Sequence, residues 1–123
     1  MKNVSRCALV FSSVLALTHA GLAYSAGKVD AGRAVFERHN CASCHGTDAK
    51  TSIDPSYPQL AGQAEDYLRH ALRAYRRGQA GMPARANIRK NPVMGAFAVQ
   101  MSEQEISDVA AYLASLPGNL KTR

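Results

Sequence analysis

The chain has 123 residues, a formal net charge of +6 and only three cysteines. It contains no repeat and no low-complexity stretch, which excludes a repeat architecture, and its length suits one small domain with a modest core. Because two of the three cysteines fall within one motif, the chain also lacks the cysteines for a disulfide framework.

The first 25 residues have the layout of a secretory signal peptide. Lys2 and Arg6 provide a positively charged start, residues 7–23 are mostly apolar, and small residues near positions 21–25 are suitable for a cleavage point. The apolar stretch is short for a membrane span and is interrupted by polar residues, so a cleaved signal is favoured over an uncleaved anchor. We therefore expect residues 1–25 to be removed and residues 26–123 to form a single exported domain. Loss of two positive charges from +6 leaves a formal charge of +4.

The first predicted helix covers residues 30–38. Asp30 is a residue type that commonly caps a helix N-terminus. Gly32, Val35 and Phe36 follow along this helix, directly before the most informative segment of the chain.

That segment is Cys41-Ala42-Ser43-Cys44-His45, in which two cysteines are separated by two residues and followed directly by a histidine. The spacing is typical of covalent c-type haem attachment, in which both thiols become thioethers on the haem vinyl groups. The histidine that follows can bind the iron through a neutral imidazole. We therefore predict one haem c, attached at Cys41 and Cys44 and ligated by His45.

Zinc binding, thiol redox chemistry and a disulfide are less well supported roles for the paired cysteines. A zinc site would need a second Cys or His pair, which the remaining cysteine and histidines do not form. A thioredoxin-like redox motif would need a βαβ setting, and no segment alternates like a strand. A local disulfide stays open as an alternative, but it would leave His45 unexplained.

A loop and a second helix follow the motif. Residues 46–62 contain two glycines and two prolines and are predicted to form a loop. Apolar residues recur at helical spacing from Gln63 to Arg77, and Gly78 is well placed to end this helix.

The last helix has the clearest signals. Ser102-Glu103-Gln104-Glu105 is a capping box, and Pro117-Gly118 marks the end of the helix. One face carries the apolar residues Ile106, Val109, Ala110, Leu113 and Leu116. The predicted fold class is therefore all-α.

The order of these features resembles class I c-type cytochromes, especially the small soluble bacterial ones. The matching features are a helix with Gly32 and Phe36, the Cys41–His45 motif, the segment Tyr57-Pro58-Gln59-Leu60-Ala61-Gly62, a methionine loop, and a last helix with Tyr112. The resemblance covers about residues 28–118. It implies a small cytochrome c fold with helices wrapped around one covalently attached haem. It also implies that the first and last helices touch, with Gly32 allowing their close approach and Phe36 and Tyr112 near the contact.

The resemblance also implies how the haem is supported. The carbonyl of Pro58 would accept a hydrogen bond from the His45 ring N–H, which would fix the imidazole tautomer. A plain turn proline is the alternative role for Pro58. Leu60 would line the haem. In this family haem is attached outside the cytoplasm, which agrees with the signal peptide.

Two methionines are candidates for the second axial ligand of the iron. Met82 stands in Gly81-Met82-Pro83-Ala84, which looks like the Met-Pro-Ala ligand loop of the family. The family ligand typically lies shortly before the cap of the last helix, and Met94 is closer to Ser102 than Met82 is. We assign the ligand to Met94, with Met82 as the alternative. Met101, next to the cap, is expected in the core or as a hydrophobic staple partner.

This ligand pair indicates a function. With His45 and Met94 both bound, the iron has no open position for a substrate, and a thioether ligand raises the reduction potential. We therefore expect an exported single-haem electron carrier and not an enzyme. The alternative is a haem c subunit dedicated to one periplasmic oxidoreductase complex.

The charge pattern suggests a class of partner. Basic residues occupy one arc of the second helix and the segment before Met94: Arg69, Arg73, Arg76, Arg77, Arg85, Arg89 and Lys90. They are expected either to form a solvated surface, which we favour, or to steer redox partner proteins with acidic docking surfaces. Nucleic acid is not expected as a partner of an exported haem protein, and no stable membrane insertion is expected after signal cleavage.

Overall fold

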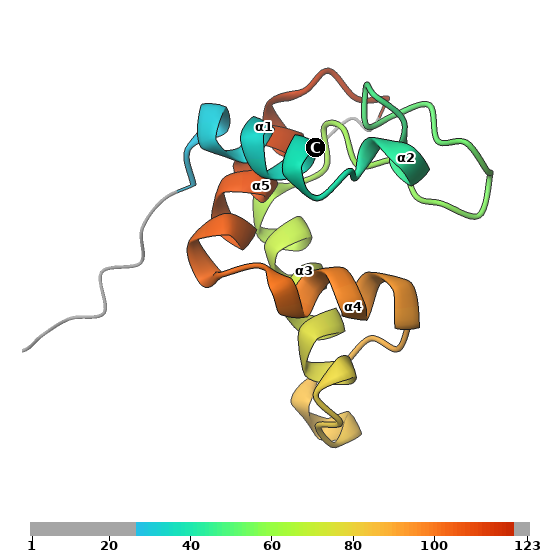
Figure 1. Ribbon diagram of the computed structural model, residues 1–123, viewed down its shortest axis with the longest axis vertical. Coiled ribbons are helices and arrows are strands. Elements are labelled where there is room, and N and C mark those ends of the chain that lie inside the picture. Colours follow the sequence, from blue (N-terminus) through green and yellow to red (C-terminus); the bar gives the residue numbers. More distant parts are fainter. Residues whose placement is uncertain (1–26, 120–123) are drawn as a thin grey trace, which may run out of the picture.

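The computed structural model describes residues 27–119, which form helices joined by loops (Figure 1). In chain order the elements are α1 (Val29–Arg38), α2 (Ala42–His45), α3 (Glu65–Gln79), the 3-10 turn η1 (Ala84–Ala86), α4 (Pro92–Gln100) and α5 (Glu103–Ser115). No strand occurs between residues 27 and 119, so the all-α prediction is confirmed. The expected signal peptide lies outside the described residues.

Helices α1 and α5 cross at close range, as the resemblance implied (Figure 1). A Cβ atom on Gly32 would overlap the backbone carbonyl of Asp108, so only glycine allows the two helices to approach this far. Beside the crossing, the rings of Phe36 and Tyr112 have centroids 5.7 Å apart at an interplanar angle of 59°. This tilted arrangement is favourable for aromatic pairs.

The core lies where α5 meets α1 and α3. Buried side chains come from all three helices: Val35, Phe36, Leu68, Leu72, Ile106, Val109, Ala110, Tyr112 and Leu113. Met101 is also buried in this cluster, which confirms its expected place in the core. Helix α3 contacts both α4 and α5, so it joins the α1–α5 pair to the part of the chain that carries Met94.

Helix α1 begins at a different residue from the one predicted. Lys28 is its N-cap and Asp30 lies within the first turn, so the prediction that Asp30 caps the helix is wrong. The start is fixed by a distant contact, because the Lys28 backbone N–H donates to Asp108 Oδ1 at 2.7 Å. A tertiary hydrogen bond therefore decides where this helix begins.

Helix α3 begins and ends later than predicted. Gly78 is not its stop but lies within the helix, which continues to Gln79. A Cβ at position 78 would overlap the carbonyl oxygen of Arg89, so Gly78 serves the packing of the following segment against α3. The left-handed glycine of the helix end is Gly81, with φ at +71°.

Residues 92–100 form a helix, α4, where the sequence predicted only a loop carrying a methionine. Asn91 caps this helix by accepting a 2.9 Å hydrogen bond from the Met94 backbone N–H, and Pro92 occupies its first turn. The periodicity signal was missing because the segment is apolar on all sides.

Helix α5 begins as predicted. The Ser102 side chain accepts from the Glu105 backbone N–H, and the Glu105 carboxylate accepts from the Ser102 backbone N–H. The capping box is therefore confirmed, and the helix ends before Pro117.

Candidate functional site

The two cysteines of the motif lie on the single turn of α2. Cys41 is the N-cap and Cys44 is three residues further on, so both side chains leave from one side of the turn. The turn is closed by the His45 backbone N–H, which donates to the Cys41 carbonyl at 3.0 Å. The two cysteines are not joined by a disulfide bond in the structure.

Cys41 lies in an apolar setting against the core. Burial raises the pKa of its thiol from 9.0 to about 11, so an unmodified Cys41 is protonated at neutral pH. A thioether sulfur does not ionise, so its burial carries no cost of removing a charge from water. The position therefore suits a sulfur that has been alkylated.

The imidazole of His45 is buried and held in one orientation. Its Nδ1 atom lies 2.9 Å from the Pro58 carbonyl oxygen, and that oxygen can only accept. His45 therefore donates from Nδ1, which leaves the lone pair of Nε2 available to a metal. The hydrogen bond implied for Pro58 is thus present. The ring of Tyr57, to which the sequence assigned no role, packs edge-on with its centroid 6.3 Å from that of His45.

The loop over residues 46–62 is fixed by its own hydrogen bonds, and it positions Pro58. The Ala49 carbonyl accepts from the backbone N–H groups of Leu60 and Ala61 at 2.8 and 2.9 Å. Asp48 accepts from the backbone N–H groups of Thr51 and Lys50, and these contacts lower its pKa to about 2. The Pro58 carbonyl is therefore presented to His45 by a structured loop.

The two methionine candidates have different surroundings. Met94, like Cys41 and Leu60, is partly buried and packs against the hydrophobic core. Met82 is 44% exposed, and its backbone N–H ends α3 by donating to the Arg77 carbonyl. Met94 therefore lies against the core, whereas Met82 is exposed to solvent.

These donors fit a c-type haem. Two thiols on one helical turn can form thioethers, an oriented imidazole can bind iron through Nε2, and a thioether from α4 is of the type that completes His/Met ligation. Zinc fits less well: within residues 27–119, no three or more His, Cys, Asp or Glu side chains gather to hold a metal ion. In the same range, no helix has the length and apolar composition of a bilayer-spanning segment.

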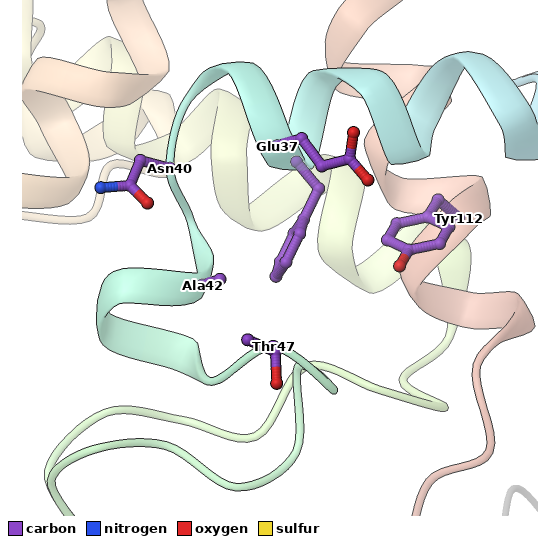
Figure 2. A pocket seen from close by; sticks show the side chains of 6 residues that line it. Glu37, Asn40, Ala42, Thr47 and Tyr112 are labelled. Atoms are coloured by element: carbon purple, nitrogen blue, oxygen red, sulfur yellow. The ribbon is translucent and has the colours of Figure 1, made fainter.

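A hollow of about 320 Å³ opens between α1, α2 and the last turns of α5 (Figure 2). It is lined by Phe36, Glu37, Asn40, Ala42, Thr47 and Tyr112. In Figure 2, Ala42 and Thr47 face Glu37 and Tyr112 across the opening. None of these lining residues is a predicted attachment or ligand residue, so the hollow is not assigned to the haem.

Comparison with known proteins supports the assignment of these residues to one family. Residues 29–117 match the family model described as cytochrome c. The chain is 32% identical to cytochrome c4 of Stutzerimonas stutzeri over 91% of its own length and 52% of that protein. It is 39% identical to cytochrome c-554(548) of Halomonas halodenitrificans over 61% of this chain and 82% of that protein. A thiosulfate dehydrogenase electron acceptor of Stutzerimonas stutzeri is 36% identical over 63% of this chain and 32% of that protein.

A solved structure gives the same result. The crystal structure of cytochrome c4 from Pseudomonas stutzeri superposes with a TM-score of 0.67 at 35% identity, covering 77% of this chain and 48% of that one. The chain thus spans about half the length of the cytochrome c4 proteins it matches. The family model, by contrast, covers most of this chain. The chain therefore belongs to the cytochrome c family and carries covalently bound haem c.

Proposed function

We propose that this protein is an exported electron carrier whose haem is attached at Cys41 and Cys44 and ligated by His45 and Met94. The observation that carries the proposal is the orientation of His45, whose Nδ1 is bound to Pro58 and whose Nε2 is free to ligate. The partial burial of Met94 against the hydrophobic core, in contrast to the exposed Met82, supports the choice of methionine. The layout of residues 1–25 as a signal peptide supports export.

The bound haem would supply a one-electron couple. The chain's own residues determine how that couple is used. The Pro58 hydrogen bond would increase electron donation from His45, while Leu60 would keep water from the haem surface. A methionine ligand on α4 would leave no open coordination position, so the same site that favours electron transfer disfavours catalysis on a bound substrate.

Substitution of each methionine tests the ligand assignment. Met94→Ala is expected to abolish the far-red charge-transfer absorption of methionine-bound ferric haem and to lower the reduction potential by roughly 100 mV or more, because a soft thioether ligand is lost. Met82→Ala is the matched control and should leave both unchanged. The reverse pattern would assign the ligand to Met82. Rapid carbon monoxide binding by the reduced wild-type protein would argue against a closed His/Met pair.

The alternative function is that of a haem subunit dedicated to one periplasmic oxidoreductase. The relative described as a thiosulfate dehydrogenase electron acceptor is the observation that favours it. Native purification distinguishes the two functions. A free carrier should be recovered as a small protein without an enzyme attached, whereas a dedicated subunit should co-purify in fixed stoichiometry with one enzyme.

A further inference from the structure

The arginines of α3 make contacts within the protein, although they appear in the sequence as a basic surface. Arg76 reaches the C-terminal end of α4, where its Nε donates to the Ala98 carbonyl at 3.1 Å and its Nη2 donates to the Met101 carbonyl. Its Nη1 also contacts Glu103 on α5. The last carbonyls of a helix have no partner within the helix, so Arg76 satisfies groups that α4 itself cannot.

Arg77 holds the segment between α3 and α4. Its Nη2 and Nε donate to the Asn87 carbonyl at 2.7 and 3.3 Å. Asn87 has a left-handed backbone with φ at +52°, a conformation that needs support from its surroundings. The guanidinium fork therefore holds the sharpest point of this segment against α3.

Arg89 holds the same segment from the opposite direction. Its guanidinium carbon lies 5.2 Å from the ring centroid of Tyr67 and 5.6 Å from that of Tyr75, both on α3. Its Nη2 also donates to the Tyr67 hydroxyl at 3.3 Å, and its backbone N–H donates to the Ala74 carbonyl at 3.0 Å. The planar guanidinium thus stacks on two aromatic side chains, which an ammonium cannot reproduce.

We propose that Arg76, Arg77 and Arg89 form an arginine clamp that fixes residues 80–91 and α4 on α3 and thereby holds Met94 in place for the iron. This inference rests on the proposed function, because it takes Met94 as the ligand. The three arginines are positioning residues: Arg77 holds the segment before α4, Arg76 holds the end of α4, and Arg89 anchors the segment to α3. Their role in the sequence pattern is therefore structural, and partner docking is not needed to explain them.

The link from the clamp to Met94 is short. The segment 80–91 ends at Asn91, whose side-chain oxygen accepts a 2.9 Å hydrogen bond from the Met94 backbone N–H. Behind Met94, Gly95 packs on Gln79 at the end of α3, where a Cβ would meet the Gln79 side chain. If the clamp loosens, the start of α4 moves more freely, and Met94 spends more time detached from the iron. A competing ligand then binds more tightly, in proportion to the detached fraction.

Lysine substitutions test the clamp, because they keep the charge and lose the fork and the stacking. The haem-loaded double variant Arg77→Lys/Arg89→Lys is expected to bind imidazole about three- to tenfold more tightly in the ferric state, since it loses forked hydrogen bonds and guanidinium–aromatic stacking of modest strength. Imidazole is neutral, so a change in surface charge does not affect its binding directly. The reduction potential of the double variant should also fall. Arg85→Lys is the matched control, in an exposed position of the same segment.

The outcomes separate the clamp from the ligand assignment. An imidazole affinity within twofold of the Arg85→Lys protein would overturn the clamp, and so would an increase that both proteins share. Loss of global stability alone would not raise the affinity, because the globally unfolded fraction of a stable protein is too small. If Met94→Ala keeps the methionine absorption band, the ligand assignment fails first. If Met94→Ala loses the band and the lysine variants do not respond, only the clamp fails.

Discussion

Two glycines, Gly27 and Gly32, allow the N-terminal end of the domain to approach α5 closely. Because a side chain at position 32 would overlap the Asp108 backbone, Gly32 determines how closely α1 and α5 pack and thus how Phe36 meets Tyr112. The obstacle is backbone and not the far end of a flexible side chain, so the structure cannot relieve it by a rotamer change. Substitution here must move a helix.

Gly32→Ala is expected to destabilise the protein by about 3 kcal/mol, because overpacking against the backbone forces the helices apart. Denaturant unfolding of the haem-loaded protein measures this loss. Gly81→Ala serves as the control, since position 81 has open space around it and a φ of +71°. Its cost should be about 1 kcal/mol, from backbone strain alone. Equal losses for the two variants would contradict the close-packing role of Gly32.

At the scale of elements, local signals were sufficient only where local contacts decide the structure. The capping box of α5 is made by residues three apart, and it could be predicted from the sequence. The start of α1 could not be predicted from the sequence, because Lys28 is held by a hydrogen bond to Asp108, which is 80 residues away in the chain. The sequence predicts a helix stop at Gly78, because nothing local shows that the Arg89 carbonyl packs on this glycine. Helix α4 did carry a local signal that was missed, since Asn91 is followed by Pro92.

The capping box also makes stability depend on pH. The Ser102 backbone N–H is the main cause that lowers the pKa of Glu105 from its ordinary value of 4.5, with a contribution from the charge of Arg38. A carboxyl with a lowered pKa stabilises the fold above its unfolded pKa. That contribution is lost as the pH falls through the folded pKa.

Glu105→Gln should therefore flatten the acid side of the stability profile. Glutamine can still serve in a capping box but cannot be protonated in this range. Between about pH 5 and pH 3, wild-type stability should fall more steeply than that of the variant, as measured by thermal unfolding. Parallel profiles would show that Glu105 does not contribute to acid sensitivity.

For the whole molecule, the attachment site was the part that sequence predicted best. Cys41, Cys44 and His45 are neighbours in the chain, and one turn of helix is enough to bring them together. The contact between His45 and Pro58 is not local, and it was expected only from the resemblance to a family. The ion pairs of the arginines could not be predicted from the sequence, because Arg73 and Arg76 pair with Glu103, about thirty residues away. Charge in a sequence does not show which charges are already neutralised.

Exposed basic residues outside the arginine clamp can be tested for electrostatic steering of a redox partner. Lys90 is exposed in the segment before α4, whereas Lys28 is exposed at the start of α1, away from that segment (Figure 1). Lys90→Glu should slow oxidation of the reduced protein by ferricyanide at low salt more than Lys28→Glu does. Both variants change the net charge equally, so the difference reports local steering. The difference should vanish at high salt, where screening shortens electrostatic range. Equal slowing by both variants would show a net-charge effect only.

The crossing of α1 and α5 also bears on the order in which the domain folds. The attachment motif follows directly after α1, but α1 has its packing partner only when the last helix is complete. Contacts between residues so far apart in sequence form late and slowly. During this interval the two thiols and His45 follow a helix that has not yet packed on α5. The topology is therefore compatible with haem attachment to a chain in which α1 and α5 have not yet packed together.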